Sequence, residues 1–237
     1  MLNEAPRLAR YAWRMATKPD QVTIDGIRLN VPDGASGRVL ASIYAEKYEG
    51  LEVRELPRLL RPDDVVVEAG AAIGFVGLVC ERIVGADNVH MIEANRDLIP
   101  EIMKNWRANG AGEPKVHHGL AAAEDGPAVE FRVANLFWAS SVIDHGQTKR
   151  IDKVDQIGLN ALFKKTSASV FICDIEGGEF ALLPSLDFSG LRLIVIELHE
   201  QRASPREMKT ALQLFDDRGF ELRQSFKNEV FIFERRS

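Results

Sequence analysis

Cysteine is scarce in this chain, which has two cysteines, Cys80 and Cys173, among 237 residues. Both lie in apolar runs far apart in the sequence, so a disulfide-stabilised scaffold is excluded and a reducing compartment is favoured. No apolar run approaches the roughly 20 residues of a membrane-spanning helix, and the N-terminal residues contain no apolar block of the signal-peptide kind. We therefore expect a soluble, cytoplasmic protein.

An excess of positive charge is also absent, because the formal net charge is -5 at pH 7. Clustered positive charge is the usual footprint of nucleic-acid binding, so nucleic acid is not an expected partner. With 46% hydrophobic residues the chain is able to bury a sizeable core. We expect one main domain over residues 61–237, and an N-terminal helical arm and small hairpin over residues 1–60 that pack on it.

The segment PRLARYAWRMATK carries a basic stripe. Its four basic residues follow one another at intervals of three, four and four, which puts them on one side of a helix: Arg7, Arg10, Arg14 and Lys18. A solvated helix face is the favoured interpretation. Contact with a membrane surface or an anionic substrate is the alternative.

The remaining chain shows two kinds of periodicity. QVTIDGIRLNVP predicts a hairpin around an Asp-Gly turn, and GRVLASIYAEKYEGLEVRELPRLL has helical spacing that is broken near Gly50. From Asp63 onward, runs rich in valine and isoleucine alternate with amphipathic stretches, which is typical of a parallel sheet covered by helices. We expect strands at DVVVEA, VHMIEA, KVHHGL, SVFICDI and LRLIVIEL, with an extra strand or hairpin at VEFRV.

The C-terminal segment FELRQSFKNEVFIFER contains two further strands. The few residues between them are too short for a parallel crossover, so the two strands must pair antiparallel. The sequence therefore predicts an α/β fold with a mostly parallel sheet that ends in an antiparallel hairpin.

The stretch VVVEAGAAIGFVGL places Glu68, Gly70 and Gly74 in the first turn from strand to helix. Ligands of such sheets bind beyond the carboxyl ends of the strands, where the strand order reverses. The spacing lacks the middle glycine of Gly-x-Gly-x-x-Gly, and a carboxylate here would repel a dinucleotide pyrophosphate. It would attract an ammonium and a sulfonium. We therefore expect S-adenosylmethionine, with Glu68 facing its cationic amino-acid end; a tight turn with a capping carboxylate is the alternative.

A second acid, Glu93, ends the strand HMIEA and lies 19 positions after Gly74. Nucleotide-binding folds present a carboxylate to ribose hydroxyls at a separation of about 20 residues. We expect Glu93 to bind the ribose, and a merely solvated glutamate is the alternative. Leu120 and Ala121, in GLAAAEDG after the third strand, are candidates for contact with the adenine.

These motifs, in this order, resemble the FkbM family of class I methyltransferases from TIDGIRLNVP to NEVFIFER. VVVEAGAAIG is similar to the family's Asp-x-Gly-Ala-Asn-Ile-Gly, MIEAN to its Glu-Pro-Asn, and CDIEGGE to its Lys-Ile-Asp-Val-Glu-Gly-Ala-Glu. KYEG, WASSV and IELH are similar to further family segments. The sequence departs from the family at Ala72, Ala94 and Ile172, where asparagine, proline and lysine are usual.

The resemblance implies a Rossmann-like class I methyltransferase fold with a seven-stranded sheet and a reversed final hairpin. It also implies S-adenosylmethionine as methyl donor, S-adenosylhomocysteine as product, and an oxygen acceptor on a sugar or polyketide. Tyr48 and Glu49 are expected to close over the cofactor. The full expected cofactor site is Tyr48, Glu49, Glu68, Gly70, Ala71, Gly74, Glu93, Ala94, Asn95, Leu120, Ala121 and Asp174.

Methyl transfer from a sulfonium requires the protein to align an acceptor hydroxyl and to remove its proton. Asp174 and Glu176 are two positions apart at the end of one strand, and Glu197 and His199 at the end of the next, so each pair is expected to point the same way. We favour His199 as general base, because a reference pKa near 6.5 leaves it mostly neutral at pH 7. Asp174 or Glu176 is the rival base, and capping of the following helix is the structural alternative.

The same four side chains could instead bind a hard divalent cation that acidifies the acceptor hydroxyl. His117 and His118 are adjacent on a strand and face opposite sides, so they do not suggest zinc. The acceptor pocket is expected to include Asn135, Trp138, Ser140, Ser141 and Glu197, with packing as the alternative role of Trp138.

The sequence thus predicts an S-adenosylmethionine-dependent O-methyltransferase acting on a hydroxyl of a saccharide or related natural-product scaffold, with a small molecule or a glycan as acceptor. A nicotinamide-dependent oxidoreductase is one alternative, disfavoured by Glu68 and by the antiparallel final hairpin. A catalytically inactive binding module that kept the fold is the other, and the departures Ala72 and Ile172 support it.

Overall fold

The computed structural model describes residues 4–32, 35–50, 52–134, 148–199, 203–226 and 229–236. No helix in these ranges combines the length and the apolar character needed to cross a membrane. The α-helices are α1 Glu4–Thr17, α2 Gly37–Tyr44, α3 Glu52–Leu59, α4 Phe75–Val84, α5 Ile99–Ala108, α6 Leu159–Thr166, α7 Glu179–Leu182 and α8 Pro205–Asp217. The strands are β1 Gln21–Ile24, β2 Ile27–Asn30, β3 Val66–Ala69, β4 Val89–Glu93, β5 Lys115–His118, β6 Leu120–Ala122, β7 Gly126–Ala134, β8 Thr148–Gly158, β9 Val170–Cys173, β10 Leu193–Glu197, β11 Phe220–Phe226 and β12 Val230–Arg235.

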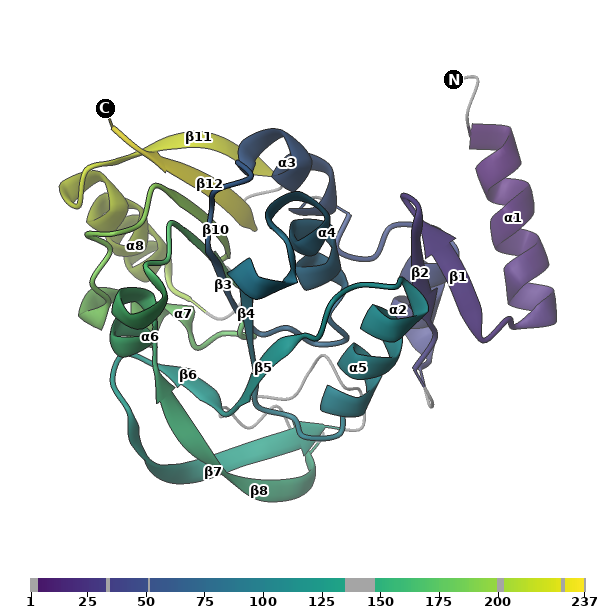
Figure 1. Cartoon of the computed structure of the whole chain (residues 1–237), viewed down its shortest axis with the longest axis horizontal. Helices are drawn as coiled ribbons and strands as arrows, with labels where there is room; N and C mark the ends of the chain where they lie inside the picture. Colours follow the sequence, from purple (N-terminus) through teal and green to yellow (C-terminus); the bar gives the residue numbers. More distant parts are fainter. Residues whose placement is uncertain are drawn as a thin grey trace.

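A seven-stranded sheet in the order β11-β12-β10-β9-β3-β4-β5 forms the centre of the protein (Figure 1). Strands β10, β9, β3, β4 and β5 pair in parallel. The last strand, β12, runs antiparallel to both β10 and β11. The predicted Rossmann-like α/β fold and its reversed final hairpin are confirmed. Because the chain proceeds from β3 toward β5 and later from β9 toward β12, the strand order reverses between β3 and β9, where such folds bind ligands.

Helices cover both faces of this sheet. Alternate strand residues point to opposite faces, so Val66 belongs to one hydrophobic core with α2, α3, α4 and α5, while Val67 belongs to the other with α6, α7 and α8. Because both faces are covered, the sequences of these strands are continuous apolar runs and do not alternate between apolar and polar residues. This burial is what made the five parallel strands visible in the sequence.

The hairpin β1-β2 packs on the edge of the same core. Val22, Ile24, Ile27 and Leu29 are buried together with residues of the central sheet and its helices. The predicted hairpin around the Asp-Gly turn is therefore confirmed, and its apolar face is continuous with the main core.

A second, three-stranded sheet, β6-β8-β7, lies beyond β5. The predicted extra strand at VEFRV is part of β7, which pairs antiparallel with β8. Strand β8 was not predicted, because TKRIDKVDQIG is rich in charged residues and only Val154 of its first eight is fully buried. Val154 packs with Phe131 and Val133 of β7 in a small core of their own.

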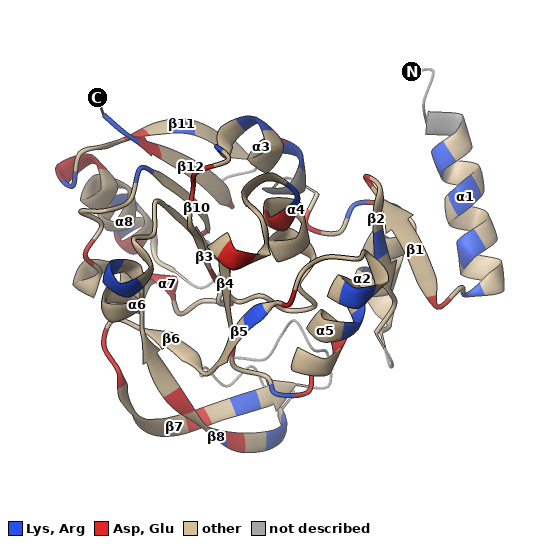
Figure 2. Ribbon diagram, viewed as in Figure 1, with Lys and Arg blue, Asp and Glu red and all other residues tan. Residues whose placement is uncertain are grey.

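Helix α1 carries the predicted basic stripe, shown in blue in Figure 2. The stripe contacts the C-terminal end of α2: Arg7 Nε donates to the carbonyl of Ala45 at 2.7 Å, and Arg14 donates to the carbonyl of Tyr44 at 2.9 Å. Arg10 and Arg14 both bind the carboxylate of Glu46. The expectation of a solvated face holds for Arg10 and Lys18, which are exposed, but it is wrong for Arg14, which is buried. Arg7 and Arg14 hold α1 on the end of another helix, where cations are favoured.

Candidate active site

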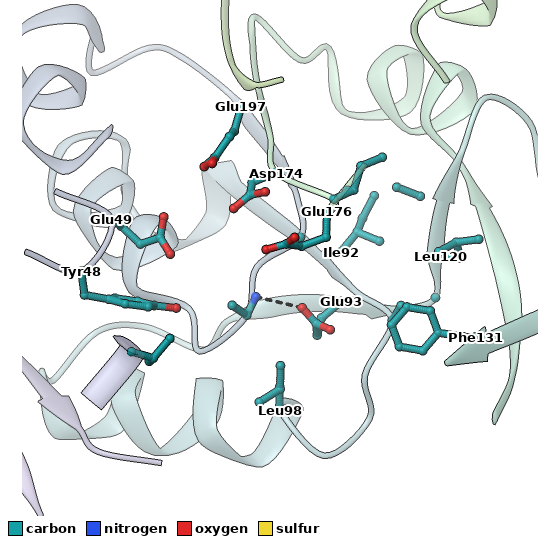
Figure 3. Close-up of a pocket in the computed structure, with 17 residues that line it drawn as sticks. Tyr48, Glu49, Ile92, Glu93, Leu98, Leu120, Phe131, Asp174, Glu176 and Glu197 are labelled. Atoms are coloured by element: carbon teal, nitrogen blue, oxygen red, sulfur yellow. Dashed lines mark hydrogen bonds between the residues drawn. The ribbon is translucent and has the colours of Figure 1, made fainter. Parts of the chain in front are cut away.

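A cavity of about 250 Å³ lies at the carboxyl ends of the parallel strands, at the point where the strand order reverses (Figure 3). This volume is slightly below the roughly 300–1,000 Å³ of typical small-molecule sites. The cavity is lined by Val39, Tyr48, Glu49, Gly70, Ala72, Ile92, Glu93, Ala94, Leu98, Gly119, Leu120, Ala121, Phe131, Asp174, Ile175, Glu176 and Glu197.

Most of the site residues expected from the sequence line this cavity, namely Tyr48, Glu49, Gly70, Glu93, Ala94, Leu120, Ala121, Asp174, Glu176 and Glu197. Four expected cofactor residues lie elsewhere, namely Glu68, Ala71, Gly74 and Asn95. Gly74 faces α5, where an added Cβ would lie 2.9 Å from Ile102 Cγ2. Asn95 is buried, and its side chain accepts a hydrogen bond from the backbone of Asp97. Asn135, Trp138, Ser140 and Ser141 fall outside the described residues.

The turn after β3 brings two strand ends close together. Gly70 has φ +89°, and a Cβ at this position would lie 1.7 Å from the carbonyl oxygen of Asp174. Only glycine allows this approach, so Gly70 holds the ends of β3 and β9 against each other. Ala72 has φ 48°, a left-handed conformation that asparagine tolerates better than alanine. The turn therefore keeps the left-handed conformation at Ala72, although alanine adopts this conformation less readily than asparagine.

Glu93 is held at the middle of the cavity by the backbone. The N–H of Ala72 donates to Oε2 at 2.8 Å (Figure 3). The N–H of Asn95 donates to Oε1 at 2.7 Å. Burial raises the pKa of Glu93 to about 7, although the backbone hydrogen bonds oppose this shift. The carboxylate therefore has a fixed orientation, and each of its oxygens keeps a lone pair for a ligand.

Glu68 does not line this cavity. Its side chain is 3% exposed and borders a neighbouring space of about 20 Å³, together with Ala71. Burial, followed by the charge of Glu93, raises the pKa of Glu68 to about 8. The expectation that Glu68 directly faces the cationic end of a ligand is not met by this geometry, because the turn and the start of α4 lie over the carboxylate.

The two ends of the cavity differ in chemistry. Leu98, Leu120 and Phe131 lie at one end, and the carboxylates of Glu49, Asp174, Glu176 and Glu197 lie at the other, with Glu93 between them (Figure 3). Leu98 and Phe131 were not recognised in the sequence. Phe131 comes from the second sheet, and Leu98 precedes α5, so neither belongs to a motif that marks the site.

His199 lies beside the acidic end. Its Nδ1 is 3.1 Å from Oε1 of Glu179, which is itself fully buried. Its Nε2 lies 3.4 Å from Glu176 Oε2, 3.8 Å from Glu197 Oε1 and 3.9 Å from Asp174 Oδ1. The expected neighbourhood of these side chains is therefore present, because β9 and β10 are adjacent. Glu179 adds a contact to His199 that the sequence did not suggest.

The protonation of His199 differs from the expectation. Burial lowers its pKa, but the hydrogen bond with Glu179 and the charges of Asp174, Glu179 and Glu176 outweigh burial and raise it to about 9. The expectation of a mostly neutral imidazole at pH 7 is therefore wrong for this geometry, and a protonated imidazole cannot accept a proton. Burial and the neighbouring carboxylates raise the pKa of Asp174 well above its usual range.

Comparisons with known proteins find similar solved structures but no matching family. No family model matches the sequence, and no curated protein matches it either. Among solved structures, the chain is similar to the FkbM methyltransferase from Methylobacillus flagellatus, with 15% identity, coverage of 84% of this chain and 55% of that chain, and a TM-score of 0.48. It is similar to a methyltransferase from Pyrococcus furiosus, with 12% identity, coverage of 99% of both chains and a TM-score of 0.48.

A third similar structure is the ribosomal protein L11 methylase from Lactobacillus delbrueckii, with 11% identity, coverage of 81% of this chain and 80% of that chain, and a TM-score of 0.48. At identities this low, similarity concerns the course of the chain alone. The chemistry of the site depends on its own residues.

Proposed function

We propose that this chain is an S-adenosylmethionine-dependent methyltransferase of the FkbM type that binds its cofactor in the 250 Å³ cavity. The observation that carries the proposal is Glu93, whose carboxylate is fixed by two backbone N–H groups between an apolar end and an acidic end of the cavity. A ribose with two neighbouring hydroxyl donors matches this carboxylate, since both oxygens retain acceptor capacity.

The two ends of the cavity match the other parts of the cofactor. Leu98, Leu120 and Phe131 provide apolar contact for the adenine, while Glu49 at the acidic end attracts the ammonium and the sulfonium. When bound, the cofactor supplies the methyl group. A pyrophosphate would meet five lining carboxylates, which disfavours a nicotinamide dinucleotide.

The acceptor is proposed to be a hydroxyl of a saccharide or related natural-product scaffold, in a cytoplasmic enzyme. The lining carboxylates favour a neutral or cationic acceptor, because they would repel the phosphates of a nucleic acid. Since His199 is protonated at neutral pH and the pKa of Asp174 is raised well above its usual range, the proton acceptor is one of the other two carboxylates that face the cavity: Glu176 or Glu197. His199 then acts through these carboxylates and does not itself serve as the base.

Calorimetric titration with S-adenosylhomocysteine tests the cofactor site. Glu93→Ala is expected to weaken binding at least tenfold, about 1.4 kcal/mol, because the ribose loses its acceptor. Glu93→Gln keeps the shape of the side chain, so a loss of affinity in this variant cannot be attributed to misfolding. It should also weaken binding. Glu113→Ala, on an exposed glutamate before β5, is the matched control and should bind like the parent protein.

Equal affinity in the parent protein and in both Glu93 variants would show that the ribose does not bind there. Binding of NADH, monitored by its fluorescence, in the absence of binding to the adenosyl ligand would favour an oxidoreductase. Binding of neither ligand would favour an inactive module.

A further inference from the structure

Four side chains at the ends of β9 and β10 form a carboxylate–imidazole cluster: Asp174, Glu176, Glu197 and His199. One ligand atom from each of Asp174, Glu176 and His199 can be chosen so that all three lie within 4.8 Å of one another. These atoms come from the turn after β9 and from the residues after β10, so two different chain segments converge on one point.

The distances inside the cluster are longer than those of charge-assisted hydrogen bonds. His199 Nε2 is 3.4–3.9 Å from its three carboxylate neighbours, whereas an N⁺–H···O⁻ bond is about 2.7–2.9 Å long. Atoms that bind one cation at about 2.1 Å lie about 3.0 Å apart in octahedral geometry and about 3.4 Å apart in tetrahedral geometry. The distances from His199 Nε2 to Glu176 and Asp174, 3.4 and 3.9 Å, are therefore equal to or slightly longer than those of atoms that share a cation, and all three ligand atoms lie within 4.8 Å of one another.

Glu179 orients the imidazole for such a role. It lies outside the cluster, is fully buried, and its Oε1 contacts Nδ1 of His199 at 3.1 Å. A metal-bound histidine usually donates its second ring N–H to a carboxylate, which fixes the ring and leaves the other nitrogen for the metal. Glu179 Oε1 also accepts hydrogen bonds from the backbone N–H groups of Gly177 and Ile175, at 3.0 and 3.3 Å, so the orienting carboxylate is itself held in place.

Two oxygens near His199 have no hydrogen-bond partner within the described part of the chain. Oδ1 of Asp174 is inaccessible to solvent, has no hydrogen-bond partner, and lies 3.9 Å from His199 Nε2. Oε2 of the fully buried Glu179 likewise has no partner. Buried oxygens without partners are costly unless something positive compensates them. This observation is independent of the ligand spacing and points to the same place.

We propose that Asp174, Glu176 and His199 bind a first-row divalent metal ion, such as Mn²⁺ or Zn²⁺, at the acidic end of the cavity, the ion displacing the proton from Nε2 of His199. One imidazole with two carboxylates suits such ions better than Mg²⁺ or Ca²⁺, which prefer oxygen ligands alone. Only the role of the ion rests on the proposed function: it would acidify an acceptor hydroxyl. Glu197 would then remain as the carboxylate that accepts the proton.

The test measures metal binding without turnover. Mn²⁺ is titrated into the chelator-treated protein and free Mn²⁺ is followed by electron paramagnetic resonance; Zn²⁺ is titrated by calorimetry. The parent protein is expected to bind one ion, with His199→Ala and Glu176→Gln each weakening the affinity at least tenfold. His118→Ala, an exposed histidine on β5, should leave binding unchanged.

A second pair of histidines has to be separated from this site. His90 and His117 stack, with Nδ1 of His90 and Nε2 of His117 3.4 Å apart, so the experiment has to exclude them as the source of Zn²⁺ binding. The double variant His90→Ala/His117→Ala is therefore included, and it should retain the tight site. Absence of binding in the parent protein, or binding that is lost with the His90/His117 pair and kept in His199→Ala, would overturn the proposal.

Titration with S-adenosylhomocysteine separates this proposal from the proposed function. If the parent protein binds the adenosyl ligand but no metal, the metal site is wrong and the cofactor site stands. If the protein binds metal at His199 but no adenosyl ligand, the proposed function is wrong and the metal site stands.

Discussion

Glu68 shows how strongly burial changes one side chain. The carboxylate lies under α4, where a Cβ on Gly77 would be 2.9 Å from its Oε2, and this oxygen has no hydrogen-bond partner among the described residues. Burial and the charge of Glu93 raise the pKa of Glu68 from 4.5 to about 8. The folded protein therefore holds a proton on Glu68 at a pH at which the unfolded chain has lost it.

This difference makes the stability dependent on pH. Between about pH 4.5 and pH 8 the folded state binds more protons than the unfolded state, so the free energy of unfolding falls as the pH rises. Glu68→Gln should flatten this dependence and exceed the parent protein by about 3 kcal/mol at pH 8. Urea unfolding at pH 5, 6.5 and 8 measures the effect. Glu113→Gln, at an exposed position, should keep the parent slope; the same slope in Glu68→Gln would contradict the assigned pKa.

At the scale of elements, Asn105 connects three of them. From α5, its Oδ1 accepts from the backbone N–H of Asn30 in β2 at 2.8 Å, and its Nδ2 donates to the carbonyl of Ile73 in the turn after β3 at 2.8 Å. Asn105 is fully buried. One turn later, Asn109 makes comparable bonds to the backbone of Arg28, but at the exposed end of the hairpin. Because Asn105 and Asn109 make similar hydrogen bonds in different surroundings, comparing their substitutions separates the effect of burial from the effect of the number of hydrogen bonds.

We expect Asn105→Ala to destabilise the protein by roughly 2–3 kcal/mol, because buried backbone groups lose their partners. Asn109→Ala should cost less than about 1 kcal/mol, because water replaces the lost bonds. Asn105→Ala should also weaken binding of S-adenosylhomocysteine, since the turn at Ile73 precedes Gly74 and α4. Urea unfolding measures the change in the free energy of unfolding, and calorimetry measures the affinity for S-adenosylhomocysteine. Equal destabilisation by both substitutions would show that burial of Asn105 is unimportant.

At the scale of the whole molecule, the carboxyl ends and the amino ends of the parallel strands have different roles. The carboxyl ends of the strands hold the cavity. At the amino ends, Asp64 precedes β3 and Arg192 precedes β10, and their side chains form a buried ion pair in which Arg192 Nε donates to Asp64 Oδ1 at 2.7 Å. Ser169, just before β9, donates to the same carboxylate at 2.7 Å. Three strand starts are thus joined at the end away from the cavity.

Asp64→Asn is expected to lower the free energy of unfolding by about 3 kcal/mol at pH 7, because it leaves Arg192 without its charge partner. Although burial raises the pKa of Asp64, the bonds from Arg192 outweigh burial and lower it, so this contribution persists above the unfolded pKa of 3.8 and is lost as the pH falls below it. Binding of S-adenosylhomocysteine should stay within twofold of the parent value. A large loss of affinity in folded Asp64→Asn protein would contradict the separation of the two ends.

Local patterns in the sequence determined the parallel strands, the final hairpin, the glycine turn and the position of Glu93, because periodicity and the chemistry of turns act over a few neighbouring residues. Strand β8 was not predicted, because it is rich in charged residues and only two of its positions are fully buried. The tertiary structure alone decided that Glu68 is buried, that Phe131 reaches the cavity from a second sheet, and that Glu179 orients His199 and, with Asp174 and Glu176, stabilises its protonated form. These features depend on distances between remote segments and on the loss of water around charges, and neither is encoded in the spacing of residues along the chain.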